Sequence, residues 1–293
     1  MSNSQRTQTS LIAGVPQTRL RGKSRHNWLW PWLVLVVVWQ VLSVALGKDS
    51  AGYAVLPGPV EIGKSAKLLS NYWPGGLGVG ATRSGAPMTW LGAVLGGLIT
   101  VAYTCARVLL GYWLGLLSGV LVAALLSWSR SLSRMFALPA HLSRMLPLLG
   151  MIPLFNFWFG ASETGAILFV AFATFVVVFP VAVTAIKEVP PHLRNYAMAM
   201  GASSVRVYVG VVLPAALPRV RGPALLAVGF AWSSVIGAEF LGAQIGLGRV
   251  VIQALAYGQS GILGLAAFLA VAFALLTYIA MSRFIDWLLR WAE

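Results

Sequence analysis

The stretch Glu163–Ile186, ETGAILFVAFATFVVVFPVAVTAI, carries a single charged residue, at its first position. A helix needs about 20 consecutive, mostly apolar residues to cross the hydrocarbon core of a bilayer. The stretch is therefore predicted to be a membrane-spanning helix, and the rest of the chain can be judged against it.

The composition of the whole chain agrees with a membrane protein. Of 293 residues, 58% are hydrophobic and only 10% are charged, and the mean hydropathy is +0.81. A soluble domain would lack a charged surface at this composition. The 21 Lys and Arg residues, against seven Asp and Glu, would suggest nucleic acid in a soluble protein. Here they lie mostly between apolar runs, so membrane lipid is the expected surrounding and nucleic acid is not an expected partner.

Five further apolar stretches have the length of membrane spans, which predicts an all-α polytopic protein with about six transmembrane helices. These stretches are 28–47, 97–127, 136–159, 224–241 and 262–281. Because the apolar run 91–126 is too long for one straight span, an interfacial segment is expected before residue 97. Pro139, Pro147 and Pro153 predict kinks in the third span.

The basic residues also predict the orientation of the chain in the membrane. Residues 1–27 are polar and carry five Lys or Arg residues, which is typical of a basic cytoplasmic tail; residues 28–290 then form one transmembrane domain. With the amino terminus inside, few cations fall on the other side: Lys48, Lys64, Lys67, Arg83 and Arg249. This asymmetry obeys the positive-inside rule and predicts that both termini are cytoplasmic. Arg107 and Arg144 remain as in-membrane or boundary residues.

Catalytic and metal chemistry find little support in the sequence. The seven acidic residues are so widely spread that a carboxylate pair for acid–base work is not expected to assemble. The three histidines and the single Cys105 have no ligand spacing for a metal. The chain is therefore predicted not to be an enzyme and to bind no cofactor itself.

One short stretch imitates a nucleotide-binding loop. Residues 58–65, GPVEIGKS, fit the pattern G-x-x-x-x-G-K-S. Pro59 removes one backbone donor from the loop, and the predicted topology places it on the side without ATP. We interpret it instead as a Pro-rich turn leading into a surface helix, with Lys64 and Lys67 on the solvated face.

A polar segment between the fourth and fifth spans has features of a docking element. It contains LRNYAMAMGAS at 193–203 and VVLPAALP at 211–218. Small side chains before and after Gly201 allow close backbone approach, and the glycine permits a tight turn between two short helices. Pro214 and Pro218 are expected to stop the second helix before the chain re-enters the membrane.

The segment 193–214 resembles the coupling loop of binding-protein-dependent ABC importer permeases. In that family a Leu-Pro pair follows a glycine, with the proline thirteen positions after it, and Gly201 and Pro214 keep this spacing. The resemblance implies the type I permease fold and contact with ATP-binding subunits. The implied coupling residues are Arg194, Asn195, Ala197, Gly201, Ala202, Ser203, Leu213 and Pro214. Asn195 and Tyr196 stand where the family has an acidic residue and an alanine, so Arg194 or the Asn195 amide is the expected substitute contact.

Other stretches are similar to the sulfonate, taurine and nitrate permeases within that family. They are 56–61, 106–111, 153–164 and 232–248. The resemblance implies a small, anionic solute such as an alkanesulfonate, taurine or nitrate, although a thiamine-precursor-like compound stays open. It also implies a bacterial inner-membrane location, ATP and magnesium bound by the partner ATPase, an extracytoplasmic solute-binding protein and a second permease copy, most simply a homodimer.

Polar residues inside membrane spans are costly and commonly face a cavity, which selects candidates for the translocation pathway. The candidates are Arg107, Trp232, Ser233, Ser234 and Glu239. Arg107 could contact an anionic substrate, or it could pair with Glu239 or a backbone carbonyl. Glu239 precedes a glycine-rich hairpin and is expected to cap or stiffen a gate.

Two other classes of protein compete with the permease interpretation. A secondary transporter would need intramembrane carboxylates or broken-helix ion sites in repeated halves. A membrane-embedded enzyme would need clustered catalytic polar groups beside its spans. Neither pattern is evident in the sequence.

Overall fold

The computed structural model describes residues 30–50, 52, 54–72, 88–240 and 242–292; the predicted basic tail at 1–27 lies outside this part of the chain. The described residues are almost entirely helical. The helices are α1 (Trp30–Leu46), α2 (Pro59–Ser65), η2 (Ala66–Tyr72), α4 (Trp90–Trp128), α5 (Arg130–Met135), α6 (Ala137–Leu142), η3 (Ser143–Met145), α7 (Leu148–Phe159), α8 (Glu163–Lys187), α9 (Pro191–Ala199), α10 (Ser204–Val207), η4 (Tyr208–Val212), α11 (Leu213–Phe240), α12 (Leu247–Ala256), α13 (Ser260–Leu288) and η5 (Arg290–Ala292).

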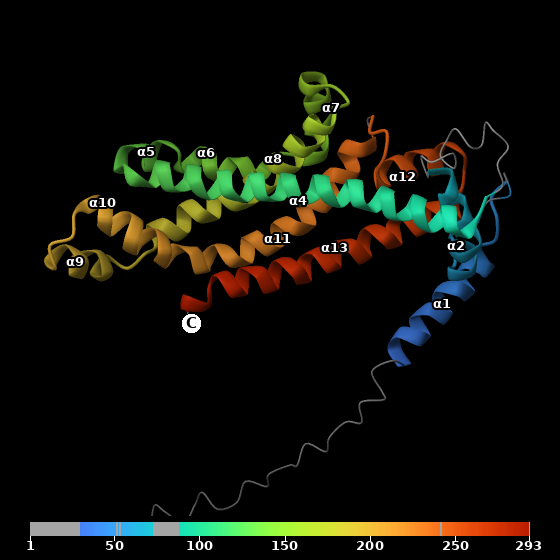
Figure 1. The fold of residues 1–293 in the computed structure, drawn as a ribbon, viewed down its shortest axis with the longest axis horizontal. Coiled ribbons are helices and arrows are strands. Elements are labelled where there is room, and N and C mark those ends of the chain that lie inside the picture. The colour runs from blue at the N-terminus through green and yellow to red at the C-terminus, as the bar shows by residue number, and fades with distance from the viewer. Residues whose placement is uncertain (1–29, 51, 53, 73–87, 241, 293) are drawn as a thin grey trace, which may run out of the picture.

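Four long helices set the shape of the molecule (Figure 1). Helices α4, α8, α11 and α13 run along its longest axis; α8 packs on both α4 and α11, and α13 packs on α11. The short helices α9 and α10 lie at one end of this bundle, and α2 and α12 lie at the other. Helix α8 is the most deeply buried of the four because it is covered by two neighbours. The core of the bundle therefore follows α8.

The lengths and apolarity of these helices confirm an all-α protein built from membrane spans. Helices α4, α8 and α13 and the continuous segment Ser204–Phe240 are each long and apolar enough to cross a bilayer. Residues 138–145 and α7 pass the same test together, as one span bent by 96°. Helix α1 has 17 residues, or about 26 Å at 1.5 Å per residue, slightly under a typical hydrocarbon core. The described residues therefore contain four spans, or five if the bent pair is one span, and α1 is a shorter apolar helix at the place of the first predicted span.

Glycines bring α4 and α8 unusually close together. Gly111, Gly115 and Gly119 recur every fourth residue and share the face of α4 that meets α8. A Cβ atom on Gly111 would lie 2.6 Å from the Cβ of Val170, and one on Gly115 would lie 2.6 Å from the Cβ of Thr174. Small residues at this spacing allow helix backbones to approach within membranes. This contact fixes the position of α4, and with it the side chains that α4 carries.

The amino-terminal part of α4 differs from the prediction. An interfacial segment was expected before residue 97, but α4 is a single helix from Trp90 to Trp128. Its first turn is capped by Thr89, whose hydroxyl accepts a hydrogen bond from the Gly92 amide at 3.0 Å. The cap satisfies a backbone donor at that end, and η2 packs along this part of the helix. The helix therefore extends past the predicted start.

Residues 58–65, which match the nucleotide-binding pattern, form helix α2 (Pro59–Ser65). Gly58 is its N-cap residue, and Pro59 is its first helical residue. Lys64 is exposed, and the Lys67 ammonium lies over the Trp90 ring at 5.2 Å. Among the described residues the only β-type pairing is an isolated bridge between Lys48 and Ala54. The predicted surface helix is confirmed, and the α/β setting that such a loop needs is missing from this part of the chain.

Candidate functional site

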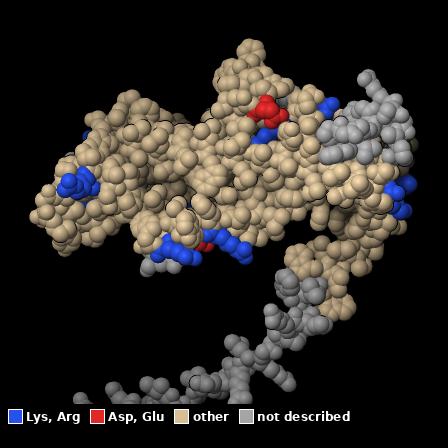
Figure 2. Space-filling model, viewed as in Figure 1, with Lys and Arg blue, Asp and Glu red and all other residues tan. Residues whose placement is uncertain are grey.

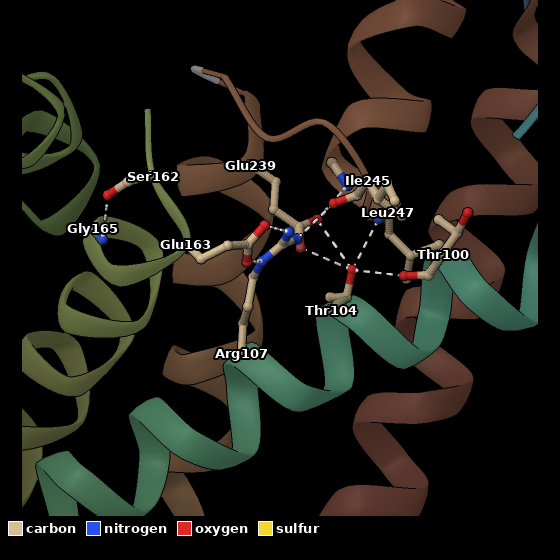
Figure 3. A network of polar contacts seen from close by, with 10 residues as sticks. Thr100, Thr104, Arg107, Ser162, Glu163, Gly165, Glu239, Ile245 and Leu247 are labelled. Carbon is tan, nitrogen blue, oxygen red and sulfur yellow. Dashed lines mark hydrogen bonds and ion pairs between the residues drawn. The ribbon is translucent and has the colours of Figure 1, made fainter. Parts of the chain in front are cut away.

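A buried ion network connects three of the long helices, with Arg107 of α4 at its centre (Figure 3). Its Nη1 donates to Glu239 Oε1 of α11 at 2.5 Å and to the Ile245 carbonyl at 2.7 Å. Its Nε and Nη2 donate to the two carboxylate oxygens of Glu163, at 2.6 and 2.5 Å. The guanidinium therefore makes a bidentate contact with Glu163 and a single contact with Glu239, a geometry that lysine cannot reproduce.

The glycine-rich turn after α11 closes around Glu239. Its Oε2 accepts a hydrogen bond from the Gly248 amide at 2.7 Å, and its Oε1 accepts one from the Thr104 hydroxyl at 2.9 Å. The same hydroxyl accepts from the Leu247 amide at 2.9 Å. Gly246 has φ +144°, and a Cβ on Gly246 or on Gly248 would lie 2.5 Å from a Glu239 atom. Glycines are required here because the backbone wraps the carboxylate without room for side chains.

The members of the network differ in their access to solvent. The side chains of Arg107 and Glu239 are 2% and 0% exposed, whereas that of Glu163 is 57% exposed. Figure 2 shows acidic atoms beside basic ones on the face between α7 and α12. Glu163 lines the rim of a cavity of about 210 Å³ whose walls come from α7, α8 and the turn after α11. The charges sum to one negative unit, since two carboxylates share one guanidinium. Arg107 also lines this cavity, but its side chain is almost fully covered, and two of its three guanidinium nitrogens donate to Glu163.

The network shows Arg107 paired, as in one of the two interpretations that the sequence left open. Its partners are Glu239 and a backbone carbonyl, as in the alternative that the sequence left open, together with Glu163. Although the acidic residues are widely spread in the sequence, folding brings Glu163 and Glu239 onto the same cation, where both are ion-pair partners of Arg107. Glu163 and Thr104 were missed as site residues. The signal for Glu163 was a lone acid beginning an apolar stretch, just after the helix-capping Ser162.

The remaining pathway candidates on α11 lie apart from the ion network. Trp232 is buried, and its indole N–H has no hydrogen-bond partner among the described residues. Ser233 and the buried Ser234 instead line a second, larger groove of about 590 Å³. Other walls of that groove come from the break between η3 and α7 and from the middle of α8. The structure thus places Arg107 and Glu239 in the ion network and Ser233 and Ser234 in a separate groove, and Trp232 lines neither the groove nor the network.

The predicted coupling segment forms a knob at the end of the bundle that carries α9 and α10 (Figure 1). Helix α9 ends at Ala199, and the chain turns at Gly201, which has φ +83°. The Ala202 amide donates to the Ala197 carbonyl at 3.1 Å, which closes the turn. Ser203 then caps α10 by accepting a hydrogen bond from the Arg206 amide. The predicted turn between two short helices is therefore present.

Solvent exposure separates the knob's residues into a buried side and an open side. Ala197 is buried, and Ala202 is half-buried. The open side carries charged, polar and large apolar side chains: Arg194, Asn195, Tyr196, Met198, Met200 and Ser203. An exposed apolar surface rimmed by polar groups is typical of a protein interface. The sequence-predicted contact residues Arg194 and Asn195 both lie on this open side.

The prolines after the knob do not stop the helix, contrary to the prediction. Pro214 and Pro218 lie inside α11, and the helical path is continuous from Ser204 to Phe240. A π-helical turn, η4, precedes Leu213, whose amide donates to the Tyr208 carbonyl. Leu213 and Pro214 are half-buried. This wider turn ends two residues before Pro214, which has no N–H, and lets the helix continue past the proline.

These elements define a multi-pass, all-helical membrane protein in which an exposed helical knob continues directly into a long span. A model of the family described as binding-protein-dependent transport system inner membrane component matches residues 111–293. The chain belongs to this family of ABC importer permeases.

Individual relatives agree with that assignment. The chain is 26% identical to the nitrate import permease protein of Synechococcus elongatus over 87% of this chain and 85% of that protein. It is 28% identical to a putative aliphatic sulfonates transport permease of Bacillus subtilis, over 82% and 79%. It is 31% identical to the taurine transport permease of Escherichia coli, over 53% and 56%.

A solved structure has the same fold. A chain of the MetNI methionine ABC transporter, in an inward-facing conformation, superimposes with a TM-score of 0.54 and 22% identity over 64% of this chain and 93% of that one. The predicted type I permease fold is confirmed. The relatives named above include the nitrate, sulfonate and taurine permeases to which the sequence was predicted to be similar.

Proposed function

We propose that the chain forms the translocation pathway for a small anionic solute and is driven by separate ATP-binding subunits. The observation that carries the proposal is the continuous helical segment Ser204–Phe240, which joins the exposed knob to the Arg107 network. At about 1.5 Å per residue, its 37 residues extend over about 55 Å. A displacement of the knob is therefore passed to Glu239 as motion of a rigid element.

The mechanism that follows is a gate at the end of the bundle that carries α12. Glu239 moves with α11, whereas Arg107 and Thr104 move with α4. If the two helices shift relative to one another, the ion pair and the hydrogen bonds to the glycine-rich turn have to break or rearrange together. Such a network favours two discrete arrangements of α4 and α11 over a continuous range of positions. Two discrete arrangements are what alternating access requires.

The relatives support an anion as the solute. Their names specify nitrate, aliphatic sulfonates, taurine and, for a permease of Synechococcus elongatus that is 27% identical, bicarbonate. These compounds share a small size and an oxyanion group. Family membership argues against the two alternatives, a secondary transporter and a membrane-embedded enzyme.

The proposed assembly follows from the family and from the distribution of charge. ATP-binding subunits, which hold ATP and magnesium, contact the knob on the cytoplasmic side, where both chain termini also lie. A solute-binding protein delivers the anion to the opposite end, near α2 and α12. A second copy of the chain completes the pathway, since this chain has one coupling segment.

Reconstitution in proteoliposomes tests the proposal. The chain is combined with its ATP-binding subunit and solute-binding protein, and uptake of labelled nitrate, ethanesulfonate, taurine and bicarbonate is measured with and without ATP. We expect accumulation of at least one of these anions that requires both ATP and the binding protein. Uptake by the chain alone in the absence of ATP would contradict the proposal.

A further inference from the structure

The second groove carries a cation that the ion network does not include. Arg144, in the 3₁₀ turn η3, lines the groove of about 590 Å³ together with Ser233 and Ser234 of α11. The other lining residues are almost all apolar. Arg144 is exposed and, within the described part of the chain, has no hydrogen-bond or ion-pair partner. It is therefore an available positive charge in an apolar setting.

The groove lies at the depth of the membrane interior. On α8 its walls extend from Phe169 to Val181, which are eighteen and six residues from Lys187 at the end of that span. At about 1.5 Å per residue, these positions lie about 27 and 9 Å along a helix of about 37 Å. On α11 the lining residues likewise occupy the middle of the helix, from Pro223 to Ser234. The groove thus extends through the middle of both spans and to within about 9 Å of Lys187, and Arg144 is one of its lining residues.

The irregular backbone between η3 and α7 also requires either water or protein around it. Leu146 and Pro147 line the groove at the break where the span bends by 96°. Irregular backbone at membrane depth is tolerated where it is buried in protein or lines a water-filled cavity. An arginine facing hydrocarbon at the same depth is costly for the same reason. The groove is accordingly expected to face an aqueous cavity rather than lipid.

Arg107 and Arg144 are chemically very different as anion ligands. Every nitrogen of the Arg107 guanidinium already donates to a carboxylate oxygen. An incoming anion would have to displace Glu163 or Glu239 from Arg107, and it would meet the excess negative charge of that network. Arg144 imposes neither cost, because no carboxylate pairs with it in the described structure.

We propose that this groove is the intramembrane binding station for the oxyanion group of the solute, with Arg144 as its cationic ligand. The guanidinium donates to two oxygens of the anion, as it does to carboxylate and phosphate groups, and the Ser234 hydroxyl supplies a further hydrogen bond. The Ser233 hydroxyl donates to the Gly229 carbonyl at 3.0 Å and would have to leave it to bind the anion. The apolar walls pack against any hydrocarbon part of the solute. This inference rests on the proposed function and assigns the substrate contact to Arg144 instead of Arg107.

Charged thiol reagents test the groove without knowledge of the natural solute. The full-length chain is placed in lipid nanodiscs as Cys105→Ala with Ser233→Cys, and rates of modification are measured with sulfonatoethyl and trimethylammonioethyl methanethiosulfonate. These reagents are water-soluble and opposite in charge, and the first carries a sulfonate. Val271→Cys, on the exposed face of α13, is the lipid-facing control, and Met200→Cys, on the knob, is the aqueous control.

We expect both reagents to modify the thiol of Ser233→Cys and neither to modify that of Val271→Cys. Adding Arg144→Gln should lower the rate ratio of anionic to cationic reagent at position 233 about tenfold, because the local attraction is lost. Arg144→Lys should retain the ratio, and Met200→Cys should show no change. Ethanesulfonate or nitrate at millimolar concentration should slow modification at position 233 by the anionic reagent when Arg144 is present, and should not do so in Arg144→Gln.

Two outcomes would overturn the proposal. An unmodified thiol in Ser233→Cys would show that lipid or protein fills the groove, including the case of a phospholipid whose phosphate contacts Arg144. A rate ratio that is unchanged in Arg144→Gln would show that this charge does not act on the anion. Because the assay needs neither ATP nor the partner subunits, its failure is distinct from failure of ATP-dependent uptake.

Discussion

The guanidinium of Arg107 in α4 lies 2.5 Å from the carboxylate of Glu239 in α11, although the two residues are 132 positions apart in sequence and both are buried. Replacing Arg107 by Gln leaves Glu239 buried without its cation. Removing one partner of a buried ion pair costs about 3–5 kcal/mol. We expect a large decrease in the melting temperature of the purified chain. The melting temperature of Arg107→Lys should lie between those of Arg107→Gln and the unmodified chain, because lysine keeps the positive charge but cannot donate two parallel hydrogen bonds to Glu163.

An exposed ion pair supplies the matched control for that prediction. Arg219 and Glu188 lie 2.7 Å apart with about half of each side chain exposed. Exposed pairs contribute about 0–1 kcal/mol, so Arg219→Gln should change the melting temperature little. Equal melting temperatures for Arg107→Gln and Arg219→Gln would contradict a structural role for the buried network.

The close contact of α4 and α8 predicts sensitivity at Gly115. Gly115→Ala would place a methyl group against the backbone and Thr174 of α8, and overpacking of this kind costs about 1–3 kcal/mol. Gly222→Ala is the control, because a Cβ on Gly222 would meet no described residue outside its own helix within 4 Å. Thermal unfolding in detergent should show a lower melting temperature for Gly115→Ala only. An unchanged melting temperature for Gly115→Ala would contradict this prediction, because it would mean that α4 and α8 can move apart without loss of stability.

The turn of the knob predicts a conformational requirement at Gly201. A Cβ there has open space, but φ is +83°, and a left-handed residue with a side chain costs about 1–2 kcal/mol. Gly201→Ala should lower ATP hydrolysis stimulated by the solute-binding protein, whereas Gly201→Asn should retain more of it because asparagine tolerates this conformation. Gly63→Ala, in α2 and without positive φ, is the control. Equal activity of all three variants would exclude a role for the turn.

Substitutions at Asn195 test whether this residue, which stands where the family has an acidic one, contacts the ATP-binding subunit. Its side chain is exposed on the open side of the knob, where a single hydrogen bond to the ATP-binding subunit would contribute about 1 kcal/mol. Asn195→Ala should therefore reduce coupled ATP hydrolysis roughly fivefold. Asn195→Glu should also change the rate, because it restores the acidic residue of the family. His192→Ala, exposed on the same helix, is the control. An unchanged rate in both Asn195 variants would remove this residue from the interface.

Much of the architecture could be predicted from local features of the sequence. The long apolar runs predicted the spans, and the prolines around residue 147 predicted the bend that the structure shows at 96°. The turn at Gly201 was predicted from its small neighbours. Pro214 was interpreted wrongly, because a π-helical turn can absorb a proline that would interrupt a regular α-helix. Local composition does not distinguish these two outcomes.

The sequence by itself determined that this chain lies in a membrane, where its spans fall and which segment forms the knob, since each depends on residues close together in the chain. Only the tertiary structure decided which charges meet. A buried arginine needs an anion, but packing of α4 against α8 and α11 selected Glu163 and Glu239 for Arg107 and selected no carboxylate for Arg144 among the described residues. Partners 56 and 132 residues apart leave no local pattern, because their encounter depends on how whole helices pack.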